Sequence, residues 1–130
     1  MKYISLITFL VLFCSCDQNS DNVLLKLIGK NDLGNYVIRD VIRESGFGDN
    51  VIAWKIVSDD KISERFHNNG KFKKVDDDDA KYARTLCLDI FPNIETDKFE
   101  ALLNDSEENE DIYVLFAPGS NSMIIIYVEY

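Results

Sequence analysis

The apolar positions early in the chain recur at the spacing of a helix. Residues 24, 27 and 28 are apolar, and a second apolar set follows at 33, 37, 38, 41 and 42. Intervals of three and four residues place side chains on one face of a helix, so the second set predicts a helix over residues 33–45. Asp32 can cap this helix and Gly46 can end it. The first set predicts a shorter helix before it.

The composition then changes to residues that favour strands. The stretch from Val51 to Val57 is rich in β-branched and aromatic residues and predicts a strand whose Trp54 faces the core. The segment from Ser58 to Phe66 begins with a capping residue and two acids, which predicts a short helix or turn. A second, short strand is expected from Lys71 to Val75.

The middle of the chain carries two further helical patterns. The segment from Ala80 to Leu88 predicts a helix, and Pro92 ends that region because proline disfavours helical geometry in the residue before it. Thr96 is positioned to cap a helix from Asp97 to Leu103, which has three apolar residues on one face. An acidic loop is expected from Asn104 to Glu110.

A β-hairpin is the clearest structural pattern in the sequence. Two strand-like segments, Asp111 to Ala117 and Ser122 to Tyr130, flank the turn residues Pro118 to Asn121. Met123 to Val128 is continuously apolar, which is typical of a strand that is central in its sheet or covered on both faces. Because helical patterns come first and the hairpin last, we expect one α+β domain over residues 23–130, with helices packed on an antiparallel sheet.

The first residues have the pattern of a targeting sequence. Lys2 is followed by an uncharged, apolar-dominated run from Tyr3 to Phe13. This run suits the core of a signal peptide and is too short to cross roughly 30 Å of hydrocarbon as a helix. Ser15 is the small residue that a signal peptidase needs before its cut, so we expect residues 1–15 to be removed and the chain to begin at Cys16.

The residues Phe13-Cys14-Ser15-Cys16 at this cut resemble the lipobox of bacterial lipoproteins, with Phe13 and Cys14 departing from its commonest residues. The resemblance implies that Cys16 carries the lipid and that residues 16–22 form a tether. It also implies a cell-envelope location outside the cytoplasm, with inner or outer membrane undetermined. Two or more acyl chains on Cys16 would hold the protein on a membrane stably. A zinc site would need a second ligand pair beside these cysteines, and a redox site would need Cys-x-x-Cys.

The charge of the chain limits its partners. The formal net charge is −9, and removal of the leader leaves 13 basic residues against 23 acidic ones, which is close to −10. Such a surface repels phosphate backbones and anionic lipid headgroups, so nucleic-acid binding is disfavoured and a basic protein partner is favoured.

Two acidic segments are candidates for binding such a partner. The first is the run of four aspartates at positions 76–79, and the second comprises three glutamates in the acidic loop; the residues are Asp76, Asp77, Asp78, Asp79, Glu107, Glu108 and Glu110. Consecutive aspartates point in different directions and lack the spacing of a calcium loop, so a metal is not expected. We expect the aspartates to begin a helix, where negative charge is favourable, and the glutamates to be solvated.

Catalytic patterns are weak. His67 and Cys87 are the only pair that suggests a cysteine–histidine nucleophile, and the apolar neighbours of Cys87 indicate a buried, inert thiol. No phosphate-binding loop or hydrolase motif is present, so we expect no cofactor and no enzyme.

These observations favour a lipid-anchored acidic module that binds another protein, such as an inhibitor or an immunity-type partner of a toxin. The alternative hypothesis is a structural or assembly accessory of an envelope complex. Small-ligand binding and catalysis are weaker alternatives.

Overall fold

The computed structural model describes residues 22–46, 49–59 and 62–130, which fall in two compact units, Met1–Leu33 and Gly34–Tyr130. In the first unit, residues 22–28 are helical and α2 (Lys30–Leu33) follows, which confirms the short helix predicted there. The predicted leader with Cys14, and the predicted lipid site Cys16, lie outside the described residues. Among the residues that are described, no helix is long and apolar enough to cross a membrane.

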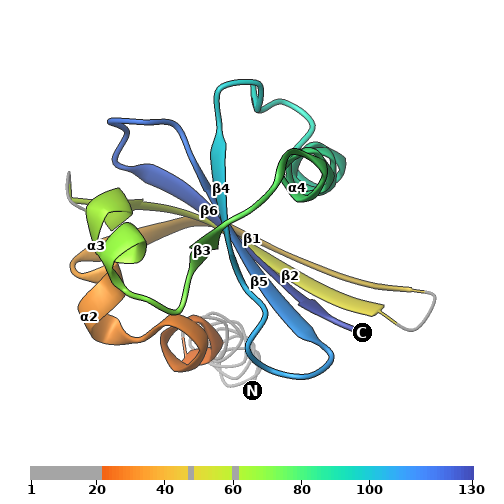
Figure 1. Cartoon of the computed structure of the whole chain (residues 1–130), viewed down its shortest axis with the longest axis horizontal. Helices are drawn as coiled ribbons and strands as arrows, with labels where there is room; N and C mark the ends of the chain where they lie inside the picture. Colours follow the sequence, from red (N-terminus) through yellow and green to blue (C-terminus); the bar gives the residue numbers. More distant parts are fainter. Residues whose placement is uncertain (1–21, 47–48, 60–61) are drawn as a thin grey trace, which may run out of the picture. The chain divides into compact units, whose positions relative to one another are not determined.

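The second unit is built on one six-stranded sheet in which every neighbouring pair is antiparallel (Figure 1). Its order is β1-β2-β6-β5-β4-β3. The strands are β1 (Tyr36–Gly46), β2 (Asp49–Ser58), β3 (Lys73–Lys74), β4 (Glu100–Asn104), β5 (Glu110–Phe116) and β6 (Ser122–Glu129). The α+β class, the short β3 strand and the hairpin of β5 and β6 are confirmed.

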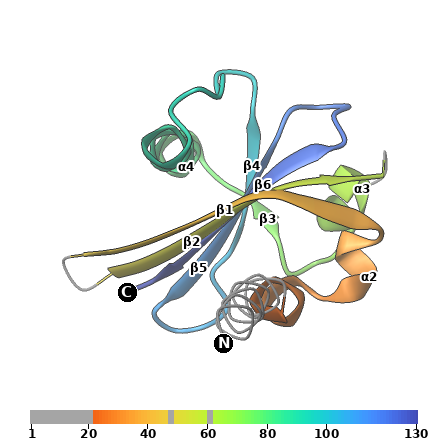
Figure 2. The ribbon, with the colours of Figure 1, turned by 180° about the vertical axis from the view of Figure 1, so that it is seen from behind.

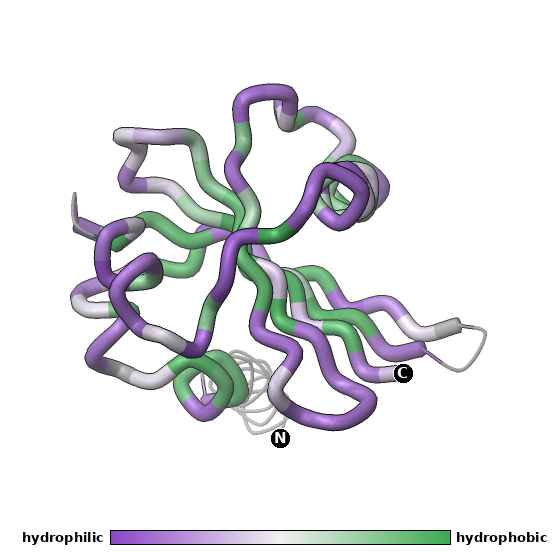
Figure 3. The backbone as a smooth tube through the Cα atoms, in the orientation of Figure 1, coloured by the Kyte–Doolittle hydropathy of each residue, from purple (hydrophilic) through white to green (hydrophobic). Residues whose placement is uncertain are grey.

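The central strand β6 explains the continuous apolar run in the sequence. It pairs with β2 on one side and with β5 on the other, and all six residues of Met123–Val128 are buried. Successive side chains of a strand point to opposite faces, so burial of every residue requires cover on both faces. Figure 3 shows hydrophobic residues along the central strands and a hydrophilic loop between β4 and β5.

Two helices of this unit lie on opposite faces of the sheet, as the views from both sides show (Figures 1 and 2). The helix α3 (Ile62–Asn68) places the His67 ring 5.5 Å from the ring of Phe116. The helix α4 (Asp77–Ile90) buries Ala83 and Cys87 against the other face. The core on the α4 side comprises Ala53, Ala83, Cys87, Ile90, Phe91, Ala101, Leu103, Tyr113, Leu115, Ile124, Ile126 and Val128.

Local chemistry sets the ends of α4. The Asp76 carboxylate accepts a hydrogen bond from the Asp79 backbone N–H at 2.8 Å, which satisfies one of the free amides of the first turn. The Phe91 N–H donates to the Cys87 carbonyl at 2.7 Å and closes the last turn before Pro92. The helix is therefore longer than predicted and includes three of the four aspartates. This confirms the prediction that the aspartates begin a helix, where negative charge is favourable.

The helix predicted over residues 33–45 is wrong, because the chain forms β1 from Tyr36 on. The register of β1 against β2 shifts between Ile38 and Asp40, so Arg39 is an extra residue in a β-bulge. After the bulge, Val41 lies on the same face as Ile38, although they are three residues apart. A bulged strand can therefore carry apolar pairs at an interval that is also the spacing of a helix.

The helix predicted from Asp97 to Leu103 is also wrong. Thr96 closes a turn instead, because its carbonyl accepts a hydrogen bond from the Phe99 N–H at 2.9 Å, and β4 begins at Glu100. Pairing with β3 and β5 buries Leu102 on one face and Leu103 on the other. A short helix with one apolar stripe would bury fewer of these side chains.

Candidate functional site

One carboxylate of the first acidic segment and one that directly follows the second lie near a cluster of tyrosines. We define the tyrosine cluster as Tyr82 of α4, Tyr113 of β5 and Tyr130, the residue after β6. The rings of Tyr82 and Tyr113 are 5.9 Å apart between centroids and tilted by 56°. Tyr113 is buried, whereas 46% of Tyr82 and 49% of Tyr130 are exposed. The cluster thus has a buried centre and two half-exposed aromatic rings.

Carboxylates flank this cluster. The Tyr130 hydroxyl donates a hydrogen bond to Asp111 Oδ2 at 2.8 Å. Burial raises the pKa of Tyr113 to about 12, and the charges of Asp111 and Asp79 act in the same direction. Partial burial and the hydrogen bond to Asp111 raise the pKa of Tyr130 as well. These phenols are therefore neutral donors at pH 7, near Asp79 of the first acidic segment and Asp111, which directly follows the second.

A second tyrosine–carboxylate group lies on the opposite face of the same sheet end. Glu110 and Glu129 face each other across β5 and β6. The Tyr127 hydroxyl is 2.9 Å from Glu110 Oε1 and 3.0 Å from Glu129 Oε2. Burial and these two hydrogen bonds raise the pKa of Tyr127. The single hydroxyl proton of Tyr127 can form a full hydrogen bond with only one of the two carboxylates at a time. The other carboxylate can therefore accept a hydrogen bond from a partner.

A hollow of about 330 Å³ lies beside this second group and is lined in part by Arg43, Ile52, Tyr127 and Glu129. It combines an apolar floor with both signs of charge. The sheet end formed by the start of β5 and the end of β6 therefore presents acid and tyrosine on both faces.

The remaining members of the acidic segments have simpler positions. Asp76, Asp77 and Asp78 are exposed at the start of α4, and Glu107 and Glu108 are exposed in the loop between β4 and β5. Within the described ranges, no group of three or more histidine, cysteine or acidic side chains has the arrangement of a metal site.

The sequence did not identify Tyr82 and Asp111 as site residues. Asp111 and Tyr113 alternate along β5, which places both on the face that α4 covers. That alternation could have indicated a shared face. The contact with Tyr82 depends on where α4 crosses the sheet, and no local pattern encodes that.

His67 and Cys87 do not form a dyad. His67 lies on α3 and Cys87 on α4, so the sheet separates them. Cys87 is fully buried, as predicted, and burial raises the pKa of its thiol to about 11.

Comparisons with known proteins identify no relative. A scan against models of protein families, a search of curated proteins and a search of solved structures each found no match.

Proposed function

We propose that this chain is a lipid-anchored envelope protein whose folded part binds a basic protein through the tyrosine cluster and its flanking carboxylates. The observation that carries the proposal is that Asp79, from the first acidic segment, and Asp111, the residue directly after the second, both act on Tyr113, beside two half-exposed tyrosines. An inhibitor or an immunity-type partner of a secreted toxin is the role that we favour.

The physical chemistry of tyrosine supports this surface as a binding site. A tyrosine buries a large area, loses little side-chain entropy and keeps a hydroxyl for hydrogen bonding. Half-exposed rings over a buried third ring give a rigid platform of the kind that dominates binding energy in interfaces. Carboxylates around it attract a cationic partner and accelerate association.

The anchor in this proposal comes from the lipobox resemblance at Cys16. A Cys16→Ala substitution should move the protein from the membrane fraction to the soluble fraction, because one cysteine carries the whole attachment. Unchanged partitioning after this substitution would contradict the anchor without affecting the binding surface.

Partner capture tests the binding surface. The tagged full chain is extracted from its native envelope in detergent and washed at roughly 0.1 M and 1 M salt, between which the Debye length falls from about 10 Å to 3 Å. We expect one basic protein, retained at low salt and lost at high salt. Tyr82→Ala should weaken its binding by about 2 kcal/mol, or roughly thirtyfold in Kd.

The matched control is Leu88→Ala, which truncates another half-exposed side chain of α4, 40% exposed and outside the tyrosine cluster. It should leave binding unchanged. Equal losses in both variants would mean that α4 as a whole, rather than the tyrosine cluster, forms the contact. Capture of several membrane-complex subunits that are insensitive to Tyr82→Ala would replace the proposal with the assembly-accessory role.

A further inference from the structure

A hollow of about 210 Å³ lies within the second unit, where α3, α4 and the edge of the sheet meet. Its polar lining consists of His67 from α3, Lys74 from β3, Arg84 from α4 and Glu100 from β4, and its apolar lining includes Phe99. The hollow is smaller than the 300–1,000 Å³ that is typical of sites for drug-sized ligands, so it suits a small occupant.

The charge of this hollow is opposite to that of the chain as a whole. Three basic side chains line it against one carboxylate, in a protein with a formal net charge of −9. Glu100 Oε2 is 3.6 Å from His67 Nε2. Neither Lys74 nor Arg84 forms an ion pair with any residue that the structure describes. Two permanent cations therefore face the hollow without a neutralising partner among those residues.

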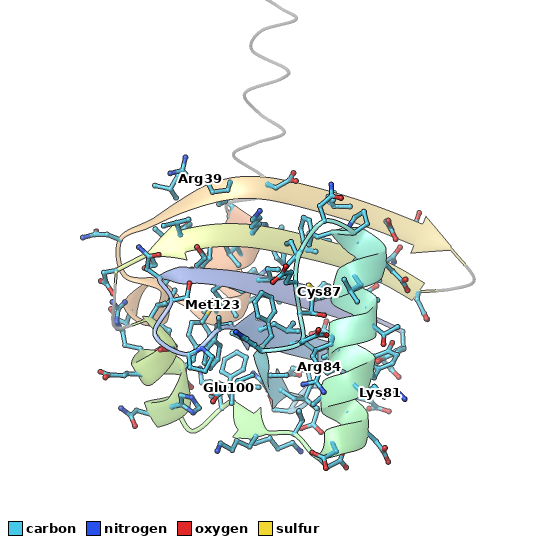
Figure 4. All side chains as sticks on the ribbon, turned by 90° about the horizontal axis from the view of Figure 1, so that it is seen from above. Arg39, Lys81, Arg84, Cys87, Glu100 and Met123 are labelled. Carbon is cyan, nitrogen blue, oxygen red and sulfur yellow. The ribbon has the colours of Figure 1, made fainter. Side chains whose placement is uncertain are left out.

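The guanidinium of Arg84 is held in position. Arg84 Nη1 donates a hydrogen bond to the Phe99 carbonyl at 3.3 Å. Figure 4 shows Arg84 on the sheet side of α4 and Lys81 on its outer side. An oriented guanidinium keeps several N–H donors for a second partner, and its planar fork matches a carboxylate. The Phe99 ring and neighbouring aliphatic side chains offer an apolar wall to the rest of such a ligand.

We propose that this hollow binds a small organic carboxylate with a short apolar body, with Arg84 and Lys74 holding the carboxylate. The ligand is either a free metabolite or the C-terminal residue of a protein, since both present the same chemistry. The site is independent of the tyrosine cluster, because Arg84 follows Tyr82 by two residues and therefore points about 200° away from it around the helix.

The single histidine of the chain provides the measurement, because His67 lines the hollow and its imidazole signals need no assignment among others. The full chain in detergent is titrated with N-acetyl-leucine and, separately, with N-acetyl-leucine amide. We expect the carboxylate to shift the His67 signals in a saturable manner and the amide to leave them in place. Equal shifts from the two probes would overturn the proposal.

Two variants locate the binding. Arg84→Gln should weaken the binding of N-acetyl-leucine about tenfold, since a hydrogen bond to a charged group is lost. Lys81→Gln removes the same charge from the same helix outside the hollow, and the affinity should not change. Circular dichroism checks that both variants fold. Equal weakening by the two variants would show that the effect is only one of net charge and would overturn the site.

A titration with a peptide that ends in leucine distinguishes the two sources of the ligand, a free metabolite and a protein C-terminus. If its affinity exceeds that of N-acetyl-leucine at least tenfold, and amidation of its terminus abolishes the gain, the hollow captures a protein C-terminus. Equal affinities identify a free small carboxylate, and both results presuppose the carboxylate site.

Discussion

The strands β6 and β1 belong to the same sheet but differ in position, in number of partner strands and in burial. β6 has partners on both sides and buries six consecutive residues. β1 is longer, pairs only with β2, and none of its described side chains is buried. It also carries a β-bulge and several charged residues, which are the usual protections of an exposed edge.

The difference shows that position in the sheet, more than hydrophobicity, decides how much a residue contributes to stability. Val41 and Ile42 of β1 are as apolar as the residues of β6, yet they are only partly buried. Stability in this unit should therefore increase from the β1 edge towards β6.

The largest expected effect is at the centre of β6. Ile125→Ala should lower the free energy of unfolding by about 2–5 kcal/mol, because Ile125 is fully buried and its truncation leaves a cavity. Urea denaturation of the full chain measures this change. A loss below about 1 kcal/mol would show that β6 is not the stabilising centre of the sheet.

A pH titration examines the core that α4 forms over the same strand. Burial raises the pKa of the Cys87 thiol from 9.0 to about 11, so the unfolded state loses this proton first as pH rises. The free energy of unfolding should therefore fall between about pH 9 and 11, by roughly 2–3 kcal/mol at the upper limit. Tyr113 adds to the decline from about pH 10, where its unfolded phenol begins to ionise.

The variant Cys87→Ala separates these contributions. It should be less stable at pH 7 but should lose less stability between pH 9 and 10 than the unsubstituted chain. Identical pH profiles for the two proteins would contradict burial of the thiol as the cause.

A smaller effect is expected just beyond the end of β6. Tyr130→Phe removes the hydroxyl that donates to Asp111 and should cost about 1 kcal/mol, since the pair is solvent-exposed. The matched change Tyr82→Phe removes a hydroxyl that forms no hydrogen bond with any described residue, and it should cost less. Equal costs would show that the loss of a hydroxyl as such, rather than of its contact with Asp111, causes the effect.

The smallest effect is expected on β1. Val37 is 53% exposed, so Val37→Ala should change stability by no more than about 0.5 kcal/mol. Native-state hydrogen exchange gives the companion measurement, because amides of β1 should exchange through local opening while those of β6 require global unfolding. Equal protection of the amides in both strands would contradict the predicted increase in stability from β1 to β6.

The same contrast explains which elements were predictable. β6 and β5 were recognisable because a short, continuous apolar run beside turn residues is typical of a buried strand. β1 was not, because its bulge at Arg39 produces apolar pairs at helical spacing. β4 was mistaken for a helix because its assignment depends on pairing with β3 and β5, and β3 is distant in sequence.

The candidate site was predictable only in its parts. The aspartates of α4 and the glutamates before β5 were identified as acidic segments from composition alone. The nearness of Asp79 and Asp111 to Tyr113 depends on the β5–β6 register and on the path of α4 across the sheet. Both are tertiary properties, and neither leaves a periodic pattern in the sequence.

The strand order has a consequence for biosynthesis. β6 comes last of the strands in the chain and yet separates β2 from β5, so β2 has only β1 beside it until the ribosome has made Ser122–Glu129. Translation delivers residues in order at about 5–20 per second, and the sheet cannot close before that segment emerges.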